Sequence, residues 1–437
     1  MKTKQLFLSA ILLVALALPQ SAFAYTFSAP SPSGQTLYYD IVSGEAQVVC
    51  PGTESWIGFN KPTGSLTIPA TVNNDGTTYN VTSIGENAFA NCMGLTAVSV
   101  SEGVSYIGNS AFAYCLSLSS IEMHDGIAYI GKNAFESCAG LSTLVIPNGV
   151  TFIDDYAFYG CSNVTSVTLP ESLNYIGGFV FSHCSSLTSV VIPNGVTFIG
   201  ESAFGSCTAM TSATIGEGLV TLCRAAFSGC SALTTVTIPS SVDSIGAYAF
   251  RHCTGLTTVN YNATNCSFMG DAASVVFDSC VSLATLNIGA NVTNIPAIAF
   301  ATCNSIQQIT CNASVPPVVA DVSAFDGISR NIPLYVPSGT IDSYKAAYAW
   351  SEFTNYQAGS TQGIGDVAQD DATVYSSHGQ IMVEGAGSSV VALYDVNGRV
   401  LAMRHAEGTP LCLDVPSTGI YLVRIGNAPA HRTVVVR

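Results

Sequence analysis

Fifteen cysteines and six histidines are the side chains of this 437-residue sequence that could serve metal binding, nucleophilic catalysis or disulfide formation. The C-x-x-C spacing of zinc ligands is absent. His183 and His252 each precede a cysteine, but adjacency in the sequence does not provide the geometry of a catalytic pair. The Gly-x-Ser-x-Gly elbow of hydrolases and the Walker phosphate loop are also absent. We therefore predict no catalytic residue, no metal site, no cofactor and no enzymatic activity.

Most of the cysteines form a regular series in which each follows a phenylalanine by three residues. Successive members are 23 residues apart, except for one step of 27: Cys92, Cys115, Cys138, Cys161, Cys184, Cys207, Cys230, Cys253, Cys280 and Cys303. We interpret them as buried thiols that act as small apolar side chains. Cys311 takes a strand core position. A disulfide between two of Cys50, Cys223, Cys266 and Cys412 stays open, because nothing in the sequence selects a pair.

The elements that must position these residues can be read from one repeat. Leu187, Val190 and Ile192 have the L-x-x-L-x-L spacing, and the last two alternate as in a half-buried strand. The segment 193–195, Pro-Asn-Gly, is a turn. The segment 201–207 brings alanine, phenylalanine and cysteine to one side at one-turn spacing, which predicts a short helical or 3₁₀ turn.

A single repeat of 23 residues cannot bury so many apolar groups alone, and stacked repeats can. The predicted fold class is therefore a leucine-rich-repeat solenoid with parallel strands, short helical turns and a 23-residue period, followed by a small all-β sandwich. The longer step, from Cys253 to Cys280, predicts a loop around residues 261–273 that bulges from one coil.

The unit Ile-Gly-x-x-Ala-Phe-x-x-Cys-x-x-Leu-x-x-Val-x-Ile-Pro resembles the BspA-like leucine-rich repeats of bacterial surface proteins, which are common in relatives of Bacteroides. The resemblance extends from about residue 81 to residue 356. It implies an extracellular protein and a part in adhesion to host proteins or to other bacteria.

The N-terminal residues 1–24 resemble a secretory signal peptide. Lys2 and Lys4 precede the apolar run 6–18, and the segment 22–24, Ala-Phe-Ala, fits the small-x-small cleavage pattern. We expect a secreted or outer-surface protein. No later stretch reaches 18 consecutive apolar residues, so we predict no membrane insertion.

The remaining segments divide the mature chain. We predict a β-rich N-terminal cap over 25–80, the solenoid over 81–312, a C-terminal cap over 313–356 with a short helix at 341–353, and a linker over 357–373.

Residues 374–437 contain short strand-like runs, which predict a small β-sandwich, and the segment 395–398, Asp-Val-Asn-Gly, is a hairpin signal. This tail resembles the C-terminal sorting domains of type IX secretion, although their Pro-Asn-Pro start is missing. A plain accessory β-domain is the alternative.

The charge of the chain excludes some partners. With 13 basic and 28 acidic residues the formal net charge is -15, so we predict no binding to nucleic acid, and anionic membranes repel the protein.

The strand positions that should point outward form the candidate binding face. They are mostly Ser, Thr and Asn, and the candidate residues are Glu122, Thr168, Thr214, Thr237, Asn260 and Asn287. The face lacks the Trp, Tyr and Arg of typical hot spots, so contacts there are weak and extended. We predict an adhesin-like protein that binds host extracellular-matrix proteins, bacterial surface proteins or glycans. The alternative is a structural spacer or coat component without a specific ligand.

Overall fold

The computed structural model describes residues 25–52 and 55–359 together with the strands of the C-terminal region. The chain divides into two compact units at Ala358–Gly359. The expected signal peptide 1–24 and residues 360–372 of the expected linker lie outside the described residues.

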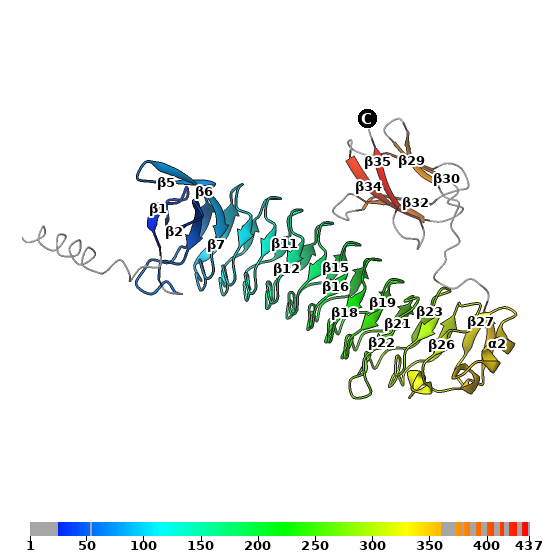
Figure 1. Cartoon of the computed structure of the whole chain (residues 1–437). Helices are drawn as coiled ribbons and strands as arrows, with labels where there is room; N and C mark the ends of the chain where they lie inside the picture. The colour runs from blue at the N-terminus through cyan, green and yellow to red at the C-terminus, as the bar shows by residue number, and fades with distance from the viewer. Residues whose placement is uncertain are drawn as a thin grey trace, which may run out of the picture. The chain divides into compact units, whose positions relative to one another are not determined.

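The first unit is a rod of stacked coils that runs from the N-terminal strands to helix α2 (Figure 1). One wall is a sheet whose repeat strands contain two residues each, here called the short-strand sheet. Its spatial order is β1 (Phe27–Pro30), β2 (Thr36–Val42), β3 (Glu45–Val49), β6 (Thr77–Ile84), β8 (Tyr106–Ile107), β10 (Tyr129–Ile130), β12 (Phe152–Ile153), β14 (Tyr175–Ile176), β16 (Phe198–Ile199), β18 (Thr221–Leu222), β20 (Ser244–Ile245) and β22 (Phe268–Met269), and β5 (Thr71–Asn74) pairs with β6.

A second wall, the long-strand sheet, is formed by the strands of the L-x-x-L-x-L segments. Its order is β11 (Thr143–Val145), β13 (Ser166–Thr168), β15 (Ser189–Ile192), β17 (Ser212–Ile215), β19 (Thr235–Ile238), β21 (Thr258–Tyr261), β23 (Thr285–Ile288), β25 (Gln308–Cys311), β27 (Leu334–Pro337) and β28 (Tyr356–Gly359). Two smaller sheets contain β4 (Gly64–Ile68), β7 (Leu95–Val100) and β9 (Ser120–Glu122), and β24 (Asn294–Ile295) with β26 (Val318–Val319). Successive coils pair in parallel, as for Val190 opposite Ala213. The predicted parallel solenoid is confirmed.

The third wall corrects the sequence prediction, because the segment 201–207 and its equivalents are turns and not helices. Most of these turns hold two residues with positive φ, such as Ser202 at 50° and Ser206 at 58°. Its backbone also bonds to the next coil, since Phe181 N donates to Ala203 O at 2.7 Å. An N–H used between coils cannot close a helical turn within its own coil.

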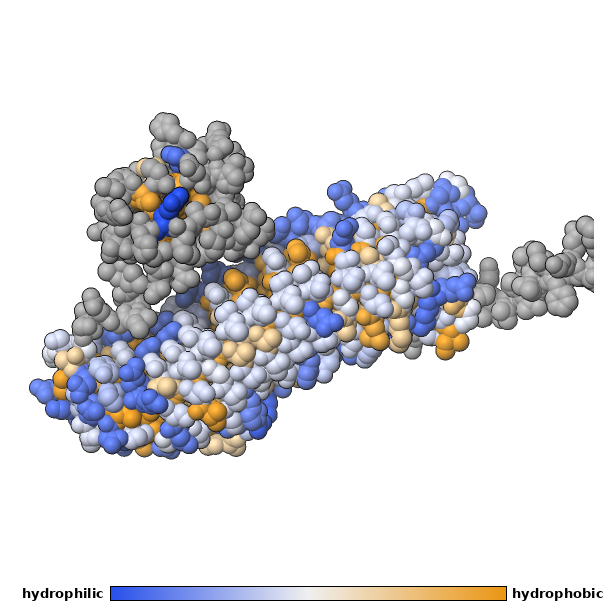
Figure 2. All heavy atoms as spheres, turned by 180° about the vertical axis from the view of Figure 1, so that it is seen from behind, coloured by the Kyte–Doolittle hydropathy of each residue, from blue (hydrophilic) through white to orange (hydrophobic). Residues whose placement is uncertain are grey.

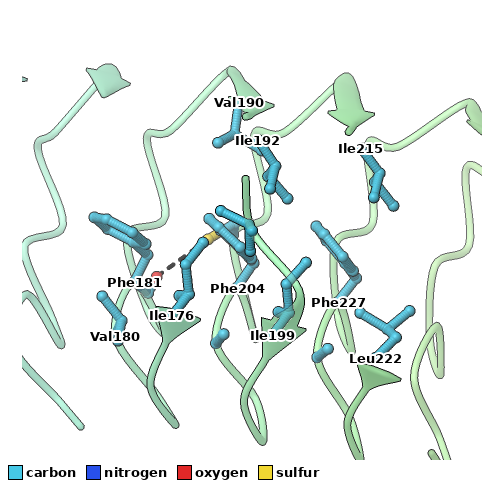
Figure 3. Packing of buried hydrophobic residues seen from close by; sticks show 14 of the residues in the cluster. Ile176, Val180, Phe181, Val190, Ile192, Ile199, Phe204, Ile215, Leu222 and Phe227 are labelled. Atoms are coloured by element: carbon cyan, nitrogen blue, oxygen red, sulfur yellow. Dashed lines mark hydrogen bonds between the residues drawn. The ribbon is translucent and has the colours of Figure 1, made fainter. Parts of the chain in front are cut away.

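The core is built around a column of stacked phenylalanine rings, one from each coil, which point into the space between the two sheets (Figure 3). Phe181 and Phe204 have ring centroids 5.3 Å apart, and Phe204 and Phe227 are 5.1 Å apart. The column continues past the last cysteine of the series to Phe325, so the segment predicted as the C-terminal cap contributes a further coil.

The two tryptophans of the chain close the ends of this column. Trp56 stacks on Phe89 at 6.3 Å and donates from Nε1 to Ala88 O. Trp350 contacts Phe325 at 5.1 Å and donates from Nε1 to Pro317 O. Each indole therefore covers an apolar end and satisfies its own polar atom.

The expected helix at 341–353 is shorter than predicted. Helix α2 (Ile341–Ala346) is followed by the 3₁₀ turn η3 (Trp350–Glu352), and a further 3₁₀ turn is η2 (Val322–Phe325). The break lies at Ala349, whose φ of 64° is not helical. Tyr344 and Trp350 are nonetheless buried, with ring centroids 5.3 Å apart.

The insertion between Cys253 and Cys280 is only partly a surface loop. Tyr261 and Cys266 are fully buried, and the exposed part is the turn around the bridge between Asp271 and Ser274. Tyr248 OH donates to Ala273 O at 2.7 Å and holds that turn against the preceding coil.

The second unit contains two antiparallel sheets. They are β29 (Thr373–Ser377), β30 (Gln380–Glu384) and β33 (Leu411–Asp414), and β32 (Val400–His405), β31 (Val390–Tyr394), β34 (Gly419–Ile425) and β35 (His431–Val435). Ile381 and Leu413 of the first sheet and Val391 and Val423 of the second are buried, as in a sandwich. Strands β31 and β32 pair antiparallel, whereas the predicted turn at 395–398 lies outside the described residues.

Close approach of the coils explains the glycine after the buried isoleucine of the short strands. A Cβ atom at Gly200 would lie 2.5 Å from Gly177 C and Gly178 N of the preceding coil. We expect Gly200→Ala to lower the free energy of unfolding by about 1–3 kcal/mol, because the backbone must shift. At Gly178 the nearest atoms would be 3.4 Å away, so Gly178→Ala is the control, with a change of about 0.5 kcal/mol or less. Urea unfolding followed by far-ultraviolet circular dichroism measures the stability of both variants. Equal losses of stability contradict close approach of the coils as the reason for Gly200.

Candidate functional site

The predicted binding face lies on the outer side of the strands, as the alternation requires. In β15, Val190 and Ile192 are buried while Val191 between them is 65% exposed. Thr168, Thr214 and Thr237 are exposed, and Asn260 and Asn287 are half-buried. These residues occupy the same position in five strands of the long-strand sheet, β13, β17, β19, β21 and β23.

The structure separates one candidate from the others. Glu122 is exposed at the end of β9, which belongs to the small sheet with β4 and β7 and not to the long-strand sheet. The remaining five are brought into one column, which ends at Tyr335, the residue opposite Thr310.

Two kinds of side chain make up this column. Val145 and Val191 alternate with Thr168 and Thr214, so the first half is mixed apolar and polar. In the second half Asn260 Nδ2 donates to Thr237 Oγ1 at 3.1 Å, and Asn287 Nδ2 donates to Asn260 Oδ1 at 2.9 Å. The amide ladder orders these side chains and leaves a flat surface of small groups.

A neighbouring column of hydroxyls is used internally. Thr165 Oγ1 donates to Ser142 O at 3.0 Å, and Thr188 Oγ1 donates to Thr165 O at 3.1 Å. Each hydroxyl thus satisfies a backbone carbonyl of the coil before it. These threonines join coils together, and their donor atoms are not free for a ligand.

The sequence reasoning missed a second outward-facing column of side chains, on the short-strand sheet. It consists of the first residues of five successive strands: Tyr106, Tyr129, Phe152, Tyr175 and Phe198. Aligning the repeats on the residue before the buried isoleucine shows these aromatic residues at intervals of 23, and that alignment could have found them. Elsewhere the visible side of the rod shows mainly weakly polar residues with small hydrophobic patches (Figure 2).

The cysteine series is confirmed as buried free thiols. Each thiol from Cys115 to Cys280 donates to the carbonyl of the phenylalanine in the preceding coil. For Cys207 the acceptor is Phe181 O at 3.2 Å, the dashed line in Figure 3. The sulfur therefore adds a hydrogen bond between coils to its apolar packing.

Burial makes these thiols weak acids. It raises the pKa of Cys184 to about 12, while a hydrogen bond from the backbone of Cys161 acts in the opposite direction. Burial likewise raises the pKa of Cys280 to about 12. Since the thiolate is the reactive form, these cysteines are poor nucleophiles at neutral pH.

The structure describes three of the four cysteines for which a disulfide stayed open. Cys50, Cys223 and Cys266 are free thiols. The side chain of Cys412 lies outside the described residues. His183 and His252 are exposed, as expected, and the His183 ring contacts Tyr159.

Within the part of the chain that the structure describes, no group of three or more His, Cys, Asp or Glu side chains is placed to hold a metal ion. The same residues include no helix long and apolar enough to cross a bilayer. The absence of enzymatic activity stays a prediction.

Comparisons with known proteins found solved structures that are similar to this chain. A leucine-rich repeat protein from Bacteroides ovatus is 24% identical, with a TM-score of 0.42 over 77% of this chain and 100% of its own. A leucine-rich repeat protein from Bacteroides capillosus is 32% identical, with a TM-score of 0.26 over 30% of this chain and 91% of its own. The pneumococcal vaccine antigen PcpA is 15% identical, with a TM-score of 0.36 over 77% of this chain and 99% of its own. Among curated proteins no match was found.

A family model described as a BspA type leucine-rich repeat region matches residues 82–211 and 176–307. Together these ranges cover more than half of the sequence. The chain therefore belongs to the BspA-type leucine-rich-repeat family.

Proposed function

We propose that this chain is a secreted or cell-surface binding protein, without enzymatic activity, that attaches to host or bacterial surface proteins or glycans along its long-strand sheet. The observation that carries the proposal is the regular outward column of Thr168, Thr214, Thr237, Asn260 and Asn287 on a flat parallel sheet. Such a column repeats one weak contact along the rod, so that many contacts add up to useful avidity.

The test compares two triple variants for binding to a panel of immobilised matrix proteins and glycans. The face variant is Thr168→Lys, Thr214→Lys and Thr237→Lys. The control adds the same charge to exposed residues beside the short strands, by Thr151→Lys, Asn174→Lys and Thr197→Lys. We expect saturable binding that weakens about tenfold or more, about 1.4 kcal/mol, in the face variant only.

Two outcomes contradict the proposal. If the control variant loses as much binding as the face variant, the long-strand sheet is not the binding surface. No saturable binding to any panel member favours the structural spacer, for which the ordered rod alone suffices.

Display on the outer surface is supported by the resemblance of the C-terminal unit to type IX sorting domains. Truncation after Gln357 is expected to retain the protein in the periplasm, measured by fractionation and by protease treatment of intact cells. Unchanged surface display of the truncated chain contradicts the sorting role.

A further inference from the structure

The five aromatic residues from Tyr106 to Phe198 form a continuous stack on the outer side of the short-strand sheet. Successive ring centroids are 4.9, 6.1, 4.6 and 4.7 Å apart, and the ring planes are within 12° of parallel. Each ring precedes a buried isoleucine, such as Ile130 after Tyr129, so the alternation directs the rings outward. Tyr106, the first ring, is 39% exposed, and the other four are half-buried.

Two adjacent carboxylates lie at the middle of this stack. Asp154 Oδ2 accepts a hydrogen bond from Tyr129 OH at 2.6 Å, and Asp155 Oδ1 accepts one from Gly178 N at 2.7 Å. Burial raises the pKa of Tyr175, and the charges of Asp155 and Asp154 raise it further, so both carboxylates act on the stack.

Neither carboxylate is neutralised by a cation. The ion pairs found among the described residues join Arg224 to Glu201, Arg251 to Asp278 and Arg330 to Glu352. Lys132 precedes Asp155 by one coil, but its Nζ lies 5.8 Å from the centre of the Tyr156 ring and forms no ion pair with either carboxylate. Two negative charges without an ion-pair partner, beside a row of aromatic rings, attract a positive group that also carries apolar surface.

We propose that the aromatic–acidic strip, defined as the five rings with Asp154 and Asp155, binds a basic protein segment in which arginine or lysine alternates with apolar side chains. The apolar side chains cover the exposed ring edges, and the cation pairs with the two carboxylates. Aromatic residues are the usual anchors of protein interfaces, and the long-strand sheet offers half-buried aromatic side chains only at its end, in Tyr335 and Tyr356.

The geometry favours a protein segment over a glycan. A sugar ring packs against the face of an aromatic ring, and here neighbouring rings cover each other's faces. Only edges remain along the stack, and ring edges pack against aliphatic side chains or make edge-to-face contacts with aromatic ones.

Residues of other coils supply variants that fit the fold. Thr221 holds the ring position in a later coil, so the aromatic variant is Tyr175→Thr with Phe198→Thr. Gly177 and Asn109 hold the positions of the two carboxylates, so the acidic variant is Asp154→Gly with Asp155→Asn. The charge control is Glu102→Gln with Glu171→Gln, two exposed carboxylates in the turns that precede the short strands. All of these variants leave Thr168, Thr214 and Thr237 unchanged.

The experiment measures the affinity of the full chain for a synthetic peptide of alternating arginine and leucine, by isothermal titration calorimetry. Thermal melts verify that each variant is folded. We expect the dissociation constant to rise about tenfold or more in the aromatic variant and in the acidic variant, and to change about twofold or less in the charge control.

Three results would overturn the proposal. The first is equal weakening in the charge control, which indicates general attraction to an acidic protein. The second is an unchanged affinity in the aromatic variant. The third is saturable binding of a neutral cello-oligosaccharide that the aromatic variant loses, which assigns the strip to glycans. The binding test for the long-strand sheet is independent of all three.

Discussion

Replacing Phe204 by alanine is expected to lower the free energy of unfolding by about 3–5 kcal/mol. The side chain is fully buried and stacks between Phe181 and Phe227, so its removal leaves a cavity in the middle of the column. Because each coil contacts only its neighbours, the lost contacts weaken the coupling between the coils before and after Phe204. Urea unfolding followed by circular dichroism measures the change.

The matched control for this prediction is in the same coil. Phe198→Ala removes the same side chain from the outer stack, where the ring is only half-buried. We expect it to cost about 1 kcal/mol, mainly from the lost contact with Tyr175. A similar loss in both variants contradicts the assignment of the inner column as the stabilising core.

Raising the pH from 9 to 10 is expected to destabilise the folded rod strongly, because burial raises the pKa of the ladder thiols above 9 in the folded state, as for Cys115 and Cys184 at about 12. The unfolded chain releases those protons near its ordinary thiol pKa, so it binds fewer protons than the folded chain in this window. Stability is therefore fully present below the unfolded pKa and declines as the pH rises above it, by about 1 kcal/mol for each thiol between pH 9 and pH 10.

Removing one thiol tests the sign and the origin of this effect. Cys184→Ala is expected to reduce the loss of stability between pH 9 and pH 10 by about 1 kcal/mol, although it weakens the protein at pH 7 through the lost bond to Phe158 O. Urea midpoints at the two pH values give the comparison. An identical pH dependence in both proteins contradicts the role of the buried thiols.

The strands and the core could be predicted from the sequence because one repeat contains their whole signal. Val190 and Ile192 are buried around an exposed Val191, as a period of two requires. The Phe and Cys of each repeat were expected in the core and are buried there.

The turns could not be predicted from one repeat, because their hydrogen bonds join different repeats. Alanine, phenylalanine and cysteine at 203–207 have helical spacing, yet the N–H of Phe204 donates to Ala226 O of the next coil. The tryptophans lie outside the repeat register, so their position at the two ends of the phenylalanine column depends on the fold of the caps.

The two candidate sites also differ in how far one repeat reveals them. Thr168 and Thr214 follow directly from strand alternation, whereas the strip around Asp154 depends on residues that become neighbours only when coils stack. Tyr129 and Asp154 are 25 residues apart in the chain and hydrogen-bonded in the structure.

The uniform pairing of the coils has a consequence for how the number of repeats evolves. The segments 145–153 and 191–199 have the same nine-residue sequence, Val-Ile-Pro-Asn-Gly-Val-Thr-Phe-Ile, and lie 46 residues apart, which is two coils. Deletion or duplication of the 46 residues between the matching stretches removes or adds two whole coils, and the strands that then become neighbours have the same register as those they replace. The rod can therefore vary in length between lineages by stepwise loss or gain of coils, with the core and both caps unchanged.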